Sequence, residues 1–223
     1  MTPVQQNLTE IRKTIPEHVT LVAVSKFQPI EAVRSAYEIG QRVFGESKVQ
    51  ELTAKQEALP ADIQWHFIGH LQTNKVKFIT PFVAMIHSVD SLRLLLEINK
   101  NAMRDGRTID ILLQIHIARE QTKFGFSPDE AIALLTEHPH TEWSNVRIRG
   151  VMGMATFTKD EQQIRTEFQI LHDLFDFLKG NFFSKDEYFN ELSFGMSDDY
   201  PIAIEEGSTM VRIGSSIFGE RNY

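Results

Sequence analysis

Short apolar runs and amphipathic stretches alternate along the whole chain. The apolar runs are rich in Val, Ile and Phe and show little polar alternation, which is typical of parallel strands buried on both faces. The run at 43–44 is the shortest and has the weakest pattern of its own. We expect eight strands, at residues 21–24, 43–44, 65–68, 83–88, 109–117, 147–152, 191–194 and 210–213.

The stretches between these runs place apolar residues at the spacing of one helix face. Ser127 precedes Pro128 and two acidic residues, as at a capped helix start. Gly40, Gly106 and Gly180 are expected just beyond helix ends, where glycine is favoured. The clearest helices are predicted at residues 30–39, 48–59, 91–103, 128–136 and 161–178.

This alternation predicts one domain of the α/β class, residues 1–223, built as a (β/α)8 barrel. No stretch rich in Pro, Gly and Ser divides the chain, whose length suits one such barrel. An open doubly wound sheet is the main alternative. That fold usually has a Gly-rich nucleotide turn after its first strand, where this chain has Ser25 and Lys26. Residues 4–19 predict an extra N-terminal helix and a proline-marked turn, which we expect to cover the barrel bottom.

The overall composition argues against several classes of protein. The net charge of −7, with no basic run, is opposite to that of most nucleic-acid-binding proteins. The absence of cysteine excludes disulfides, thiolate zinc sites and a cysteine nucleophile. The N-terminus lacks the pattern of a signal peptide, and no apolar stretch is long enough to span a bilayer. We therefore expect a cytoplasmic protein that binds neither nucleic acid nor membrane.

Two Gly/Ser turns near the C-terminus mark a candidate site. The seventh and eighth predicted strands end at residues 195–197 (Gly-Met-Ser) and 214–216 (Gly-Ser-Ser), each ahead of a helix. Such loops bind phosphate in many (β/α)8 barrels, through backbone N–H groups and hydroxyls. Ser and Asp at these positions are also ordinary helix caps. The joint fit of both loops to one site favours phosphate binding over capping alone.

Two cations are expected at the same end of the barrel. Lys26 follows the first predicted strand; in a partly desolvated mouth its amine would have a lowered pKa and could attack an aldehyde. The alternative is a rim lysine that extends into solvent. Arg212 points to the same side as Gly214, so it could bond a ring nitrogen or a carboxylate of a ligand, or pair internally with Glu46. Together these residues suggest a phosphorylated ligand with a carbonyl group.

A metal site is not expected. His66 and His70 have the spacing of a helical zinc pair, but the glutamate of the metalloprotease motif is missing. The segment around them also has the pattern of a strand followed by a turn rather than a helix. The zinc interpretation is therefore weak.

Several motifs spread over nearly the whole chain carry a family resemblance. They are Ala23-Val-Ser-Lys26, Phe44-Gly-Glu46, Trp65-His-Phe-Ile-Gly-His70-Leu-Gln72, Asn74-Lys75, Lys123-Phe-Gly125, Met152-Gly-Met154, Leu192-Ser-Phe-Gly-Met-Ser197-Asp-Asp-Tyr200, Arg212-Ile-Gly-Ser215 and Phe218-Gly-Glu-Arg221. With these motifs the chain resembles the pyridoxal phosphate homeostasis proteins. The resemblance implies the barrel of the N-terminal domain of alanine racemase.

The resemblance also implies a cofactor, pyridoxal 5′-phosphate (PLP), and the residues that hold it. Lys26 would form a Schiff base with PLP, while Ser197, Gly214 and Ser215 would hold the phosphate. Arg212 would contact the pyridine nitrogen and leave it unprotonated, which weakens PLP as an electron sink.

Three further positions are less certain members of this pocket. The resemblance implies that His66 and Met154 line it. The family usually has Asn-Tyr after Phe-Gly-Glu, where this chain has Ser47 and Lys48. A contact of Ser47 with PLP is therefore in doubt, and Lys48 could add positive charge near the mouth.

Two functions from different classes remain. The resemblance implies a PLP-binding protein of vitamin B6 homeostasis without robust turnover, with PLP-dependent apoenzymes as candidate recipients. The alternative is a PLP-dependent amino-acid racemase, which needs acid/base groups on both faces of the substrate. In alanine racemase the second group is a tyrosine from another domain across a dimer interface, and this chain shows no such domain. No motif suggests that acid/base role for the tyrosines at 37, 188, 200 and 223, so we expect a carrier. The second domain is also what dimerises the racemases, so we expect a monomer.

Overall fold

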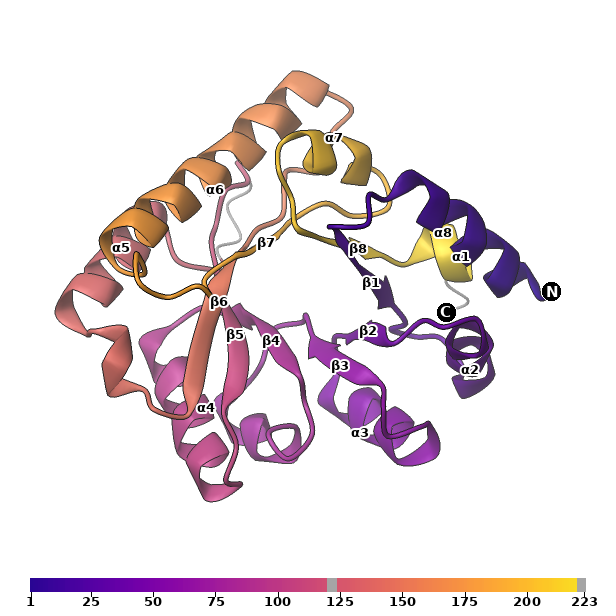
Figure 1. Ribbon diagram of the computed structural model, residues 1–223, viewed down its shortest axis with the longest axis horizontal. Coiled ribbons are helices and arrows are strands. Elements are labelled where there is room, and N and C mark those ends of the chain that lie inside the picture. Colours follow the sequence, from indigo (N-terminus) through magenta and orange to yellow (C-terminus); the bar gives the residue numbers. More distant parts are fainter. Residues whose placement is uncertain (120–123, 220–223) are drawn as a thin grey trace.

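Eight parallel strands pair in chain order and close into a barrel in the computed structural model, which describes residues 1–119 and 124–219 (Figure 1). The last strand pairs with the first, so the sheet has no free edge. This confirms the predicted (β/α)8 barrel. The strands are β1 (Thr20–Val24), β2 (Val43–Glu46), β3 (Gln64–Phe67), β4 (Met85–Val89), β5 (Ile109–Gln114), β6 (Val146–Met152), β7 (Glu191–Ser193) and β8 (Met210–Ile213).

Helices surround the barrel, and none of those in the described ranges is long and apolar enough to cross a membrane. The predicted start of the fifth helix is confirmed: Ser127 and Glu130 form a capping box, with Pro128 in the first turn. The helices are α1 (Pro3–Thr14), α2 (Ile30–Glu38), α3 (Val49–Ala58), α4 (Leu92–Arg104), α5 (Pro128–Glu137), α6 (Glu161–Asn181), α7 (Tyr200–Glu205) and α8 (Ser215–Phe218). Two 3₁₀ helices, η1 (Thr73–Phe78) and η2 (His140–Glu142), were not predicted, because such short helices lack a full apolar period.

Two of the three predicted helix-end glycines lie where expected. Gly40 and Gly106 follow α2 and α4 with φ of 91° and 65°, the left-handed conformation that ends many helices. Gly180 was wrongly placed, since α6 continues through it to Asn181.

The N-terminal helix exists, but its predicted place across the barrel bottom is wrong. Helix α1 packs on the side of the barrel against α8 and α2 (Figure 1). Leu8 is fully buried there, and the Asn7 side-chain amide donates to the carbonyl of Ile217 at 3.1 Å. The reason is the length of α8: four residues are too few to cover the β8–β1 side of the barrel, and α1 completes that cover.

Alternate side chains along each strand point into the barrel. The lowest interior layer is apolar and consists of Val22, Met85, Leu112, Met152 and Met210. Above it, β3, β4, β7 and β8 place a buried polar layer in the interior, which consists of His66, His87, Ser193 and Arg212.

The polar layer is a hydrogen-bonded row that crosses the barrel. His66 Nδ1 lies 2.8 Å from His87 Nε2, and His87 Nδ1 lies 3.1 Å from Ser193 Oγ. Arg212 completes the row by donating to Ser193 Oγ at 2.7 Å. Burial lowers the pKa of His66 to about 4 and that of His87 well below its usual value, so both rings are neutral at pH 7.

A bulge interrupts the pairing of β5 with β6. Ile111 pairs with Ile148 but Leu112 pairs with Gly150, so one residue of β6 is left over. Gly150 has a φ of 154°, and a Cβ there would lie 1.8 Å from the backbone oxygen of Glu191. Only glycine fits this position, where the pairing register of β6 changes by one residue.

We expect Gly150→Ala to destabilise the protein by about 3 kcal/mol or more, because a backbone atom of β7 must move to admit the methyl group. The control is Gly180→Ala in the last turn of α6, where no atom lies within 4 Å of the added Cβ. That change should stabilise by up to about 1 kcal/mol. Equal free energies of urea unfolding for the two variants would contradict this account of the bulge.

The buried histidine pair predicts a specific loss of stability in acid. The folded-state pKa of His66, about 4, lies below its usual value of 6.5, so the unfolded chain takes up a proton that the folded chain does not. The resulting stabilisation is complete above pH 6.5 and is lost as the pH falls toward 4, at a cost of about 3 kcal/mol.

Urea unfolding across this pH range, in wild type and in a His66→Leu/His87→Met double variant, measures the effect. The double variant should lose less stability on acidification. Wild type and variant share all other titrating groups, so the difference between them comes from His66 and His87. The same pH dependence in both would show that the pair is not buried in its neutral form.

Candidate functional site

One cavity of about 240 Å³ opens at the carboxyl ends of the strands. The strand alternation that fills the interior also builds it, since Lys26 lies two residues beyond inward-facing Val24, and Gly214 lies two beyond Arg212. The lining residues are Val24, Lys26, Ser47, Ile68, Met154, Met196, Ser197, Asp198, Arg212, Gly214 and Ser215.

This set contains seven of the eight residues predicted for the site; the exception is His66. The prediction missed Val24, Ile68, Met196 and Asp198. Val24 and Ile68 could have been found from strand alternation. Val24 lies two residues before Lys26, and Ile68 lies two residues after His66, whose side chain points into the barrel.

Lys26 is half-buried and lies in a tight turn directly after β1. The carbonyl of Ser25 accepts a hydrogen bond from the Gln28 N–H at 3.0 Å. Phe27, the third residue of this turn, has a φ of 63°, as in a type II turn. The turn fixes the direction in which the chain leaves the strand and places the lysine on the cavity wall.

The two Gly/Ser loops are joined directly. The Gly214 N–H donates to Ser197 Oγ at 3.2 Å, so the loops after β7 and β8 form one wall. A Cβ on Gly214 would lie 3.2 Å from the backbone oxygen of Val24, so a larger residue would press on β1. Within residues 1–119 and 124–219, the Ser215 and Ser216 N–H groups have no acceptor. The Ser215 N–H, on the cavity wall, is therefore available to an anion in the cavity.

Arg212 forms the floor of the cavity and is almost completely buried. Its guanidinium donates to the Ser193 carbonyl and hydroxyl at 2.8 and 2.7 Å, and to the Gly153 carbonyl at 3.0 Å. Burial lowers its pKa to about 10, partly offset by Asp199, so it stays cationic at neutral pH. Three of its five N–H donors are used among the described residues, which leaves two for a ligand.

The alternative ion pair between Arg212 and Glu46 does not form. In β2, inward-facing Gly45 lies against Val22 and Val24, so the next residue, Glu46, points out of the barrel. Its carboxylate pairs there with Lys55 of α3 at 2.7 Å. The nearby carboxylate that acts on Arg212 is Asp199, which is itself buried and accepts a hydrogen bond from the Met196 N–H.

His66 and His70 are separated by the fold. His66 belongs to the buried row beneath the cavity and reaches Arg212 through His87 and Ser193. His70 is half-exposed and lies 3.2 Å from Asp90. No group of three metal-binding side chains occurs in the described part of the chain, and the two histidines do not form a pair.

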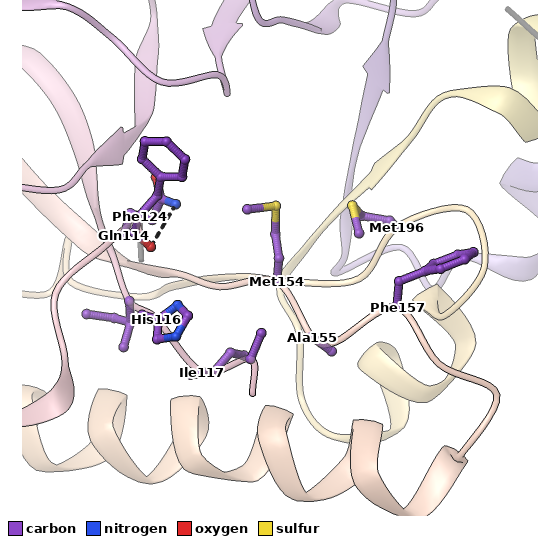
Figure 2. Close-up of a pocket in the computed structure, with 10 residues that line it drawn as sticks. Gln114, His116, Ile117, Phe124, Met154, Ala155, Phe157 and Met196 are labelled. Carbon is purple, nitrogen blue, oxygen red and sulfur yellow. Dashed lines mark hydrogen bonds between the residues drawn. The ribbon is translucent and has the colours of Figure 1, made fainter. Parts of the chain in front are cut away.

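A second cavity of about 210 Å³ adjoins the first and shares Met154 and Met196 with it. Figure 2 shows Met154 projecting between Gln114 and Phe124 on one side and Met196 on the other. Phe124 and Met154 are about half-exposed. Flexible methionines thus form the boundary between the candidate cofactor cavity and a more apolar neighbour.

Lys48, the second departure from the family pattern, does not line the Lys26 cavity. Its ammonium lies 4.6 Å from the centre of the Phe27 ring, on the rim of the barrel. The described tyrosines, Tyr37, Tyr188 and Tyr200, also lie away from the cavity. The motif residues Lys123, Glu220 and Arg221, together with Tyr223, lie outside the described ranges.

Comparisons with known proteins agree with this fold and these motifs. The family model for the alanine racemase N-terminal domain matches residues 2–222. The pyridoxal phosphate homeostasis protein of Aquifex aeolicus is 41% identical over 91% of this chain and 87% of its own. The human protein of the same name is 40% identical over 99% of this chain and 83% of its own.

Solved structures show the same likeness. PipY of Synechococcus elongatus without PLP is 35% identical, with a TM-score of 0.90 over 97% of this chain and 100% of PipY. The PipY structure with PLP bound is 34% identical with a TM-score of 0.87, over the same shares of both chains. Alanine racemase of Streptomyces lavendulae, at 18% identity and a TM-score of 0.76, shares the fold over 97% of this chain and 56% of its own. This chain therefore belongs to the pyridoxal phosphate homeostasis protein family.

Proposed function

We propose that this protein binds PLP reversibly in the Lys26 cavity and serves vitamin B6 homeostasis by holding and releasing it. One observation carries the proposal: a single cavity joins a half-buried lysine, two linked Gly/Ser loops and a buried arginine with unused donors. The names of the relatives and the PLP-bound structure of PipY support it.

The residues present fit the chemistry of PLP. When bound, PLP supplies three groups: a phosphate dianion, a pyridine nitrogen, and an aldehyde that condenses with a primary amine. The Lys26 amine is the nucleophile for the aldehyde. The unused Ser215 N–H at the start of α8 and the hydroxyls of Ser197 and Ser215 would bind the phosphate.

Arg212 favours holding PLP over turnover. With PLP in this cavity, a cationic guanidinium beside the pyridine nitrogen would donate a hydrogen bond and disfavour protonation of that nitrogen. An unprotonated ring withdraws electrons less strongly from a bound amino acid. The same side chain is held by Ser193 and Gly153, so it can orient the ring without moving.

The racemase alternative lacks a tyrosine in the cavity to serve as the second acid/base group, among the described residues. Tyr37 donates to Asp62, and Tyr200 lies 2.9 Å from the Thr14 hydroxyl, both outside the cavity. We therefore propose a cytoplasmic carrier that acts as a monomer and passes PLP to apoenzymes. The wall formed by the flexible side chains of Met154 and Met196 supports release.

Lys26→Ala should abolish covalent attachment of PLP. Borohydride treatment of the wild-type protein mixed with PLP should fix the cofactor on the peptide that contains Lys26, as read by mass spectrometry. The matched control is Lys48→Ala, which removes a second amine from the same rim but not from the cavity. It should retain stoichiometric labelling.

Stoichiometric labelling of Lys26→Ala would contradict the assignment of the nucleophile. The same proteins test turnover, by chiral chromatography of several amino acids after incubation with PLP. We expect no inversion. Reproducible inversion that disappears in Lys26→Ala would establish the racemase instead.

The phosphate loops predict selective loss of phosphorylated ligands. Ser197→Ala/Ser215→Ala should weaken PLP binding about tenfold or more, because hydrogen bonds to a charged group contribute about 1.5–3 kcal/mol each. Binding of unphosphorylated pyridoxal should change little. Ser216→Ala, in the same loop but off the cavity wall, is the control. An equal loss for both ligands would place the phosphate elsewhere.

A further inference from the structure

A buried ion cluster lies behind the turn that carries Lys26. The Lys55 ammonium, on α3, lies 2.7 Å from Glu46 Oε1 and 2.7 Å from Glu51 Oε1. It also donates to the Ser25 carbonyl at 2.6 Å. The Lys55 and Glu46 side chains are 4% and 0% exposed, and Glu51 is 21% exposed. We call these three ionic side chains the Lys55 cluster.

Stability alone does not explain this cluster. Burying a lysine and a carboxylate removes their hydration, and such pairs are often no more stable than apolar residues of similar size. Glu46 Oε2 is also buried without a hydrogen-bond partner among the described residues, which adds to the cost. An apolar contact between β2 and α3 would avoid both penalties.

The cluster instead holds the backbone on both sides of Lys26. Before the lysine, the Ser25 carbonyl accepts from Lys55, and the Ser25 hydroxyl donates to Glu46 Oε1 at 2.6 Å. After it, the Phe27 N–H donates to Glu51 Oε1 at 2.6 Å. Because Lys55 bonds both carboxylates, the two sides are tied to one another.

The held turn is one that the chain does not favour by itself. Phe27 has a φ of 63°, a region that glycine occupies freely and that is strained for other residues. Loss of the bond to Glu51 would therefore weaken the hold on this conformation and on the direction of the lysine.

We infer that Lys55, Glu46 and Glu51 are positioning residues, which fix the Ser25–Gln28 turn from outside the barrel so that the Lys26 amine projects into the cofactor cavity. The inference rests on the proposed function, since it assigns the cluster to covalent attachment of PLP. Orientation of a nucleophile accelerates a reaction without changing how the reactant binds. Loss of a positioning residue should therefore slow attachment of PLP without weakening its binding. Loss of a structural residue should impair both binding and folding.

Glu51→Ala gives the cleanest test, because Lys55 and Glu46 remain as a neutral pair and no uncompensated charge is left buried. Two ligands separate binding in the cavity from reaction with Lys26. PLP does both, whereas pyridoxine 5′-phosphate has no aldehyde and can only bind. We expect the variant to form the PLP imine at least about tenfold more slowly in stopped-flow absorbance. Its Kd for pyridoxine 5′-phosphate, measured by calorimetry, should stay within about twofold of wild type, since the phosphate loops and Arg212 are untouched.

Two further variants complete the design. Glu51→Gln keeps an oxygen that can accept from the Phe27 N–H, and it should recover most of the imine rate. Glu57→Ala makes the same change on an exposed part of α3 and should behave as wild type. Glu51→Ser removes the contact while keeping a polar side chain, so it can replace Glu51→Ala if that variant folds poorly.

An unchanged imine rate in Glu51→Ala would overturn the inference. So would equal losses of imine rate and of pyridoxine 5′-phosphate binding, or failure of both Glu51→Ala and Glu51→Ser to fold, since each indicates a structural role. Failure of the proposed function looks different: wild type would form no imine, or Lys26→Ala would form it as wild type does.

Discussion

Side chains of a strand point alternately to its two faces, and closing eight parallel strands turns this alternation into an inside and an outside of the barrel. Every part of the candidate site depends on that division. Lys26 faces the inside, and its neighbours Ser25 and Phe27 are held from the outside by Glu46 and Glu51. The reacting amine and the groups that orient it are therefore separated by the sheet itself.

The inside has its own gradient of polarity. The apolar layer at the bottom is followed by the row of His66, His87, Ser193 and Arg212, and then by the open cavity. Neutral histidines suit this place, because burial and the neighbouring Arg212 both disfavour a second cation there. The row holds the guanidinium still while leaving two donors for a ligand.

Much of this could be predicted from the sequence. The barrel follows from eight apolar runs between amphipathic helices, and the two Gly/Ser loops join as expected because the seventh and eighth strands are neighbours. The family motifs added residue roles for Lys26 and Arg212 that periodicity alone leaves open.

What the sequence did not predict depends on contacts between elements distant in the chain. Glu51 and Lys55 have the i, i+4 spacing of an ordinary solvent-exposed pair, and only the packing of α3 over Glu46 makes the pair buried. The Arg212–Glu46 pair was wrong for a related reason, since the direction of Glu46 depends on the register of a strand that the sequence marks weakly. The position of α1 depends on how short α8 is, which the apolar pattern does not show.

The central claim is that one cavity holds PLP by Lys26, the two Gly/Ser loops and Arg212. A crystal structure of this protein grown with PLP tests it most directly. The account predicts continuous density from the Lys26 Nζ to the cofactor, the phosphate between Ser197 and Ser215, and the pyridine nitrogen against Arg212. Cofactor density that is not joined to Lys26, or that lies outside this cavity, would contradict the account.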